Sequence, residues 1–170
     1  MGALLQFKDG GYVPDGVGLL ISILWRYPEV STIHYWQEQH ALKFTFMLMD
    51  IDDVSGLQVK LPEALSVFHK LENRKMLNCN VEFRQEERVC VLTITRDVDS
   101  MTQSEVGLIV DLVKLEFHNS LIIDQTDLPE DEIILQEELI GQMLATILSS
   151  DIDKNVMAVR EEGKVLVFKA

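Results

Sequence analysis

The chain has 170 residues, of which 47% are hydrophobic and 25% are charged, and 28 acidic against 15 basic side chains leave a formal net charge of −13. This length and composition predict one domain over residues 1–170 with its own core, and they exclude a disordered, collagen-like or coiled-coil chain. The negative charge disfavours nucleic-acid phosphates and anionic membranes as partners.

The first predicted unit is a helix followed by a hairpin. Pro14 and Asp15 form a helix start, because proline lacks the donor that a first turn leaves unpaired and the acid suits the helix dipole. The helix is predicted over residues 15–27, where Pro28 ends it. Strands are predicted over residues 32–36 and 41–49 from their apolar and β-branched content.

The second predicted unit repeats this order. Pro62 and Glu63 predict a helix over residues 62–73, and strands follow over residues 78–84 and 88–96. Alternation along these strands would place four apolar side chains on one face, opposite Glu82 and Arg84. The four are Val81, Phe83, Val89 and Val91.

An additional helix is predicted after Thr102, which forms a capping box with Glu105. Apolar residues recur at helical spacing and cover most of the circumference, which predicts a central helix rather than a surface helix. One stripe comprises Val106, Ile109, Val110, Val113 and Phe117, and a second comprises Leu108, Leu112 and Leu115. Residues 120–124 are a candidate short strand.

The last predicted unit is a helix over residues 130–148 and a C-terminal hairpin with a turn at residues 161–163. The predicted opposite pairs are Val159 with Val165 and Met157 with Val167. Both faces of this hairpin are apolar, which is typical of a covered sheet or of a subunit interface. An uncovered sheet edge of this composition would aggregate, so we expect a dimer that buries it.

Three segments of the sequence resemble one another: YWQEQHALKF from Tyr35, FRQEERVCVL from Phe83 and VREEGKVLVF from Val159. Pro14 precedes Tyr35 by 21 residues, as Pro62 precedes Phe83. The spacing predicts repeat units at residues 14–50, 62–98 and 129–170, with shared helix-hairpin patterning as the alternative explanation. The predicted fold is therefore α+β, with a mostly antiparallel sheet built from three helix-hairpin (αββ) units plus one extra central helix.

Targeting signals and cysteine usage favour a soluble, cytoplasmic protein. No basic region precedes an apolar stretch at the start of the chain, and the apolar run at residues 16–25 is about half a membrane span. Cys79 and Cys90 fall on one predicted hairpin at positions that do not face each other. Two reduced thiols are therefore favoured over a disulfide.

Two groups of residues could carry metal or acid–base chemistry. If the first hairpin had the register predicted for the last, His34 would face Leu42 and His40 would face Trp36, so both imidazoles would share a face. Carboxylates that could hold Mg²⁺ or Ca²⁺ occur in three short sets. These are Asp50, Asp52 and Asp53; Asp97 and Asp99; and Asp151 and Asp153.

Each of these groups also has a purely structural explanation. The two histidines could be a surface pair beside Trp36, and the aspartates could be turn formers and helix caps. A third zinc ligand, an EF-hand spacing, a phosphate-binding glycine loop and a GxSxG elbow are all missing from the sequence. We therefore expect no cofactor and favour no metal site.

Charge is distributed unevenly along the chain. Residues 115–153 contain ten acidic residues and no lysine or arginine. This stretch could form a docking face for a basic partner, or a solvated helix face that keeps an acidic protein soluble.

Three function classes remain open at this stage. The favoured class is a non-enzymatic, intracellular protein-interaction module, working as a homodimer that buries the C-terminal hairpin or the region of Trp25 and Trp36. The second is a small metal-dependent hydrolase that uses His34 or His40 with the acidic loops. The third is a small-ligand-binding regulatory domain with a pocket between repeat units.

Overall fold

The computed structural model describes residues 15–123, 128–149, 155–161 and 164–169. Within them, four α-helices accompany a six-stranded antiparallel sheet, which confirms the predicted α+β class. The helices are α1 (Asp15–Arg26), α2 (Ser55–Leu71), α3 (Gln103–Phe117) and α4 (Glu130–Ser149), and the short 3-10 turns η2 (Val98–Ser100) and η3 (His118–Ser120) flank α3. The strands are β1 (Thr32–Trp36), β2 (Ala41–Met49), β3 (Cys79–Glu86), β4 (Val89–Asp97), β5 (Val156–Glu161) and β6 (Lys164–Lys169).

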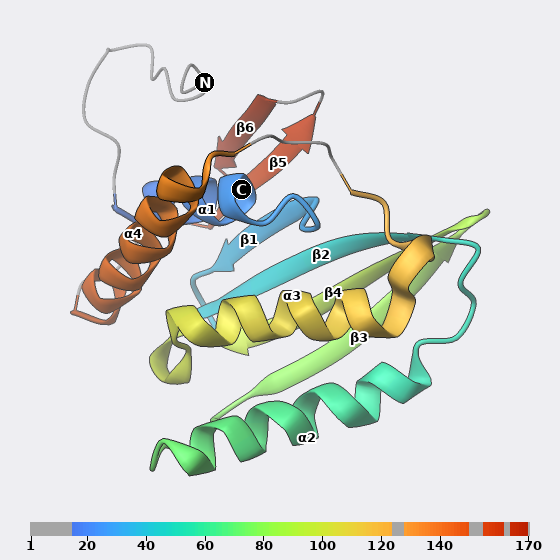
Figure 1. Ribbon diagram of the computed structural model, residues 1–170, viewed down its shortest axis with the longest axis horizontal. Coiled ribbons are helices and arrows are strands. Elements are labelled where there is room, and N and C mark those ends of the chain that lie inside the picture. The colour runs from blue at the N-terminus through green and yellow to red at the C-terminus, as the bar shows by residue number, and fades with distance from the viewer. Residues whose placement is uncertain (1–14, 124–127, 150–154, 162–163, 170) are drawn as a thin grey trace.

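The strand order across the sheet is β3-β4-β2-β1-β5-β6, so three sequential hairpins lie side by side (Figure 1). The first hairpin occupies the middle, where β2 pairs with β4 and β1 pairs with β5. The second and third hairpins flank it and leave β3 and β6 as the two edge strands. The C-terminal hairpin is therefore a sheet edge rather than a central strand pair.

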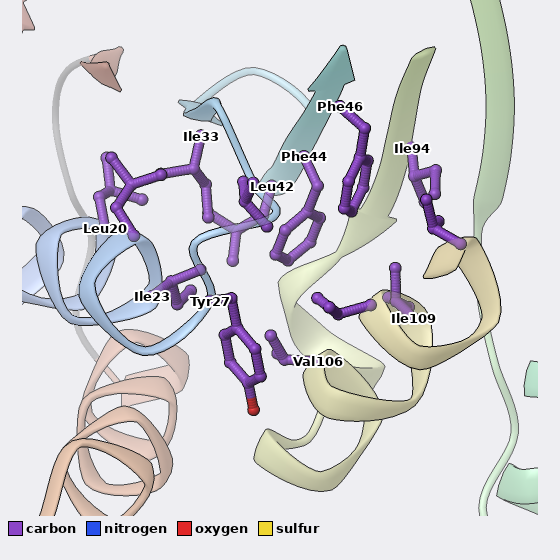
Figure 2. Packing of buried hydrophobic residues seen from close by; sticks show 14 of the residues in the cluster. Leu20, Ile23, Tyr27, Ile33, Leu42, Phe44, Phe46, Ile94, Val106 and Ile109 are labelled. Atoms are coloured by element: carbon purple, nitrogen blue, oxygen red, sulfur yellow. The ribbon is translucent and has the colours of Figure 1, made fainter. Parts of the chain in front are cut away.

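The helices cover one face of this sheet and bury alternate strand residues beneath them. Ile33, Phe44 and Phe46 point from the strands toward α1 and α3, as Figure 2 shows. Leu20 and Ile23 of α1 meet them within the same buried cluster. The other helices contribute Leu57, Leu61 and Leu65 from α2, Val106 and Ile109 from α3, and Ile140 and Leu144 from α4. This arrangement is a two-layer fold with all described helices on one side of the sheet.

Several predicted elements are confirmed. The strands of the first hairpin have the predicted bounds, and α1 ends at Arg26, two residues before Pro28. At the start of α3, the Thr102 hydroxyl accepts a hydrogen bond from the Glu105 N–H at 3.3 Å, as expected of an N-cap. The first predicted apolar stripe of α3 is buried along its whole length.

The predicted start of α2 is wrong. The helix begins at Ser55, and Pro62 lies inside it rather than at its first position. Asp53 provides the turn before the helix, since its carboxylate accepts a hydrogen bond from the Ser55 N–H at 2.9 Å. Both proline and aspartate are common at helix starts, and the sequence-based prediction used Pro62 rather than Asp53 as the marker of the start.

The prediction that α3 is a central rather than a surface helix is wrong for its second apolar stripe. α3 lies over the middle of the sheet, but Leu115 of its second stripe is 75% exposed (Figure 1). The candidate strand at residues 120–124 is reduced to a single bridge between Leu121 and Leu48 within the described residues.

The predicted registers of two hairpins are wrong by one residue. His34 lies opposite Lys43 rather than Leu42, because residues 37–40 form a four-residue turn in which His40 adopts a left-handed φ of 48°. Val159 lies opposite Leu166, and Met157 opposite Phe168. A one-residue slip changes which residues share a face, so Val165 and Val167 face the helices while Val159 does not.

The second hairpin shows a related error. Val81 and Phe83 share a face with Ile94 and Leu92, as their pairing requires. Val89 and Val91 were predicted on that face, but they lie on the opposite face with Glu86 and Arg84.

The helix-hairpin order occurs three times along the chain, with α3 as the additional helix. Thr45 and Thr93, which are 48 positions apart, lie opposite each other in the β2–β4 pairing. If the first two units were copies related by a local two-fold axis, equivalent residues would be 48 positions apart and one such pair would face itself across the axis, as Thr45 and Thr93 do. Pro14 and Pro62 are also 48 positions apart. Pro62 nevertheless lies within its helix and Pro14 lies outside the described residues, so an ancestral repeat stays a prediction.

Candidate functional site

The face of the sheet opposite the helices is not covered by any other described helix or strand, and we call it the open face. One row of side chains crosses all six strands of this face, through successive opposite pairs: Glu82, Thr93, Thr45, Thr32, Val159 and Leu166. A parallel row comprises Asn80, Thr95, Lys43, His34, Met157 and Phe168. The remaining members are Trp36, Ala41, Met47, Met49, Arg84, Glu86, Val89, Val91, Asp97, Glu161 and Lys164.

On β5 and β6 the open face exposes large apolar side chains to solvent. Leu166 is 40% exposed and Phe168 is 48% exposed, and both lie on the edge strand β6. At the other end of the face, Met49 is exposed beside the half-buried Met47. Threonines separate the two apolar regions along the middle of the sheet.

The exposed charges on the open face balance. Lys43, Arg84 and Lys164 offset Glu82, Glu86 and Glu161, and the buried Asp97 is paired with Arg96. The pKa of His34 is lowered by burial and by the Lys43 charge, so this imidazole is neutral at physiological pH. The excess of acidic residues that makes the chain −13 therefore lies elsewhere on the molecule.

The two edge strands of the sheet differ in how they are protected. β3 exposes charged and amide side chains along most of its length, which discourages pairing with another strand. β6 has the sequence KVLVFK, in which only the two ends are charged. This edge is continuous with the apolar side of the open face.

The structure separates the two predicted catalytic histidines. His34 lies on the open face and packs edge-on against Trp36, with ring centroids 5.1 Å apart. His40 lies in the turn, packs against the buried Tyr35 and has its Nδ1 3.0 Å from a carboxylate oxygen of Asp99. Trp25 belongs to α1 on the helix-covered side, so Trp25 and Trp36 do not form one surface either.

The structure also separates the predicted metal-binding aspartates. Asp50 follows Met49, the last residue of β2, and forms two hydrogen bonds of 2.9 Å with Arg88. Asp97 of β4 lies opposite Ala41, at the other end of β2. Asp52 is exposed near Asp50, Asp53 caps the turn before α2, and Asp151 and Asp153 lie outside the described residues. Among the described residues, no three His, Cys, Asp or Glu side chains come together in a way that could hold a metal ion.

Neither cysteine has the features of a reactive thiol. Cys79 and Cys90 are free and lie opposite Arg96 and Gln85 respectively, on separate positions of the hairpin. Burial raises the pKa of Cys79 to about 11, and it also raises the pKa of Cys90. Both side chains therefore remain protonated at neutral pH and act as packing residues.

A network of buried ionic groups, which we call the Arg96 network, joins four elements beneath α3. The fully buried Arg96 guanidinium donates to both carboxylate oxygens of Glu105, at 2.8 Å to Oε1. Glu105 also accepts a hydrogen bond from the buried His69 of α2. Arg96 further donates to the Asp97 carboxylate and, at 2.7 Å, to the Asn78 carbonyl.

Hydrogen bonds set the charge state of the aspartate in this network. Burial alone would raise the pKa of Asp97, but hydrogen bonds from Ser100 and Asn78 and the charge of Arg96 hold it below its usual 3.8. The Ser100 hydroxyl donates to Asp97 at 2.6 Å, and the Asn78 N–H donates at 2.9 Å. Every polar group in the network has a partner, so its chemistry is that of a structural clamp.

Sequence reasoning missed the Arg96 network. Its signal was an arginine at an inward position of β4, in register with Cys90, Leu92 and Ile94. A charge at a core position requires a buried partner of opposite sign. The wrong prediction for the faces of β4 concealed this signal.

The acidic stretch at residues 115–153 is partly neutralised by the helices around it. Glu116 pairs with Lys60 at 3.1 Å, and Glu137 pairs with Arg26 at 2.7 Å. Glu130, Asp131 and Glu132 occupy the first turn of α4, where the helix dipole favours negative charge. These contacts support an ordinary helix surface for the described part of the stretch.

In the described part of the chain, no helix combines the length and apolar character needed to cross a lipid bilayer. Comparisons with protein-family models, curated proteins and solved structures found no match for this chain.

Proposed function

We propose that this protein is a non-enzymatic interaction module that pairs with a second copy of itself through the open face. The observation that carries the proposal is the one-sided fold: the described helices bury one face of the sheet, while the opposite face presents Leu166, Phe168 and Met49 to solvent. A second sheet packed on this face would bury these three side chains.

Charge favours a second copy as the occupant. Two chains of net charge −13 repel each other unless their acidic surfaces point apart. Face-to-face packing through a charge-balanced surface places both helix layers, with most of the acidic residues, on the outside. A basic partner would instead find its complement on the helix side.

The available area also suits a dimer. Six strands spaced about 4.8 Å apart span about 24 Å, and six residues of strand span about 20 Å. Each copy therefore offers about 500 Å², and two copies together bury about 1,000 Å², which reaches the lower limit for a specific interface.

Light scattering coupled to size exclusion tests the proposal at micromolar concentration. We expect a particle of twice the 19.4 kDa chain mass, which dissociates on dilution. Leu166→Lys introduces a charge into the open face and should weaken dimerisation by about tenfold or more, because an unpaired charge would be buried.

Leu115→Lys is the matched control, since Leu115 is an exposed leucine on the helix side. It should leave the dimer unchanged. A wild-type protein that stays monomeric over the whole concentration range, or equal weakening by both variants, would contradict pairing through the open face.

A further inference from the structure

His34 lies near the centre of the open face, where a second sheet would cover it. Its strand, β1, is an inner strand of the sheet, and its neighbours in sequence, Ile33 and Tyr35, are buried on the helix side. Because side chains alternate along a strand, His34 points to the open face. There it lies between Lys43 of β2 and Met157 of β5. A sheet packed over the middle of this face therefore reaches His34.

The contacts of His34 suit a neutral imidazole. Its Nε2 atom is buried and has no hydrogen-bond partner in the part of the chain that the structure describes. The ring packs edge-on against Trp36, and the Lys43 ammonium lies 4.8 Å from the centre of the Trp36 ring. Protonation would give His34 a positive charge and a second N–H donor, and these contacts offer no acceptor for that donor.

The charged group that faces His34 from the flanking strands is Lys43, directly opposite on β2. On β5, the open-face residues beside His34 are the apolar Met157 and Val159. Burial and the Lys43 charge both lower the pKa of His34. Protonation would therefore place two positive charges side by side.

The other titratable groups near this part of β1 do not offset the charge of a protonated His34. Glu38 is exposed in the turn after β1, and His40 of the same turn faces Asp99. Asp97 lies on the open face two strands away from β1, where it is paired with Arg96. Among the described residues, no carboxylate forms an ion pair with His34.

We propose that protonation of His34 separates the two copies, so that pairing through the open face is sensitive to acid. This inference rests on the function proposed above, because the second copy is what removes His34 from water. In the single chain the side chain is half-buried, so water can still solvate part of a protonated ring. Under a second sheet, the same charge would be buried beside Lys43 without a partner of opposite sign.

Proton linkage gives the sign of the effect. If the dimer excludes the proton that each separate copy can bind, a falling pH favours the separate copies. The net charge of the chain acts in the opposite direction, because protonation reduces the repulsion between two copies of charge −13. Weakening of the dimer by acid therefore distinguishes a buried titrating group from a general effect of charge.

Sedimentation velocity of the full chain at constant ionic strength, from about pH 7.5 to about pH 5, measures the dissociation constant of the dimer. NMR of the His34 ring protons in protein diluted to the monomer gives the pH at which His34 is half protonated. At that pH the dissociation constant should be about fourfold higher than at about pH 7.5, because each of the two copies takes up a proton on separation. Circular dichroism at each pH checks that the chain stays folded.

His34→Gln replaces the imidazole with a polar side chain that does not titrate, so its dissociation constant should not rise as the pH falls. His118→Asn is the matched control, because it removes an exposed imidazole that follows α3 and lies outside the open face. Asparagine also tolerates the positive φ of 35° at this position. The His118→Asn dimer should weaken with acid as the wild-type dimer does.

Three results would overturn the role of His34 and leave the pairing itself standing. They are a wild-type dimer that is equally tight at about pH 7.5 and about pH 5, half protonation of His34 only below about pH 5, and equal weakening by acid in His34→Gln. A chain that is monomeric at about pH 7.5 would instead contradict the proposed function, and it would overturn this inference as well.

Discussion

The Arg96 guanidinium is fully buried and donates hydrogen bonds to two carboxylates, a carbonyl and the Ser100 hydroxyl. The free energy of burying this charge depends on all of these partners. Burying a charge is costly unless its partners are buried with it. Loss of one partner leaves the other charge buried and uncompensated, which is strongly destabilising.

Glu105→Gln tests this at a single residue. It should lower the free energy of unfolding by about 3–5 kcal/mol, because Arg96 and His69 lose their shared carboxylate. Urea denaturation measures the change. Glu116→Gln, which breaks an exposed ion pair with Lys60, should cost less than about 1 kcal/mol. A similar small loss for both variants would show that the Arg96 network is not a stability element.

Asp97 gives the same network a pH dependence of defined sign. Its folded pKa lies below the usual 3.8, so its ionised form stabilises the fold above that value, and the stabilisation is lost as pH falls through the folded pKa. In Asp97→Asn the group cannot titrate. The stability difference between wild type and Asp97→Asn should be constant from about pH 7 to about pH 5 and should narrow by about pH 3. Urea denaturation at each pH measures it, and a difference that stays constant down to about pH 3 would contradict this role.

At this scale the sequence carried part of the information. The Thr102 cap is visible because it depends on residues three apart, and the buried stripe of α3 is visible because it depends on helical spacing. The separation of His34 from His40 was not predictable, because it depends on one additional residue in a turn.

Among the elements, the C-terminal hairpin is joined to α1 by the hydrogen bonds of one side chain as well as by buried apolar contacts. Arg160 of β5 donates to the carbonyl oxygens of Leu24, Tyr27 and Val30, at 3.1 Å to Tyr27 and 3.0 Å to Val30. These carbonyls lie in the last turn of α1 and just after it, where no further helical N–H is available. One guanidinium therefore caps a helix and fixes an edge hairpin.

Arg160→Lys should lower the free energy of unfolding by about 1–2 kcal/mol, since an ammonium group cannot present the same fork of donors. Hydrogen exchange should also become faster in β5 and β6. The control is Arg84→Lys, an exposed arginine paired with Glu86, for which no change is expected. Unchanged exchange in β5 and β6 for Arg160→Lys would contradict the attachment.

Element order was more predictable than element contacts. Apolar spacing and proline positions predicted the bounds of β1 and β2 and the end of α1, because these depend on local sequence. The position of the third hairpin at a sheet edge depends on pairing between β1 and β5, which are more than 100 residues apart. Patterns of neighbouring residues in the sequence do not predict which distant strands pair.

On the scale of the whole molecule, the acidic excess lies outside the open face, whose exposed charges balance. Exposed apolar side chains occur on both sides of the sheet: Leu71 is 80% exposed and Leu115 is 75% exposed on the helix side, and Phe168 is 48% exposed on the open face. If two copies pair through the open face, the driving force is burial of apolar area, and the charges oppose association only from a distance.

The placement of the acidic charge outside the open face predicts how salt affects the dimer. Raising NaCl from about 50 mM to about 500 mM should leave the dissociation constant unchanged or lower it by about threefold, because salt screens the repulsion between two acidic chains and leaves apolar burial intact. Sedimentation velocity over a dilution series measures the constant at each salt concentration. Leu115→Lys, on the helix side, should show the same trend. The contradicting result is a dimer that weakens by about tenfold or more at the higher salt concentration. Attraction between opposite charges would then hold the two copies together. The contact would have to involve the helix side rather than the open face.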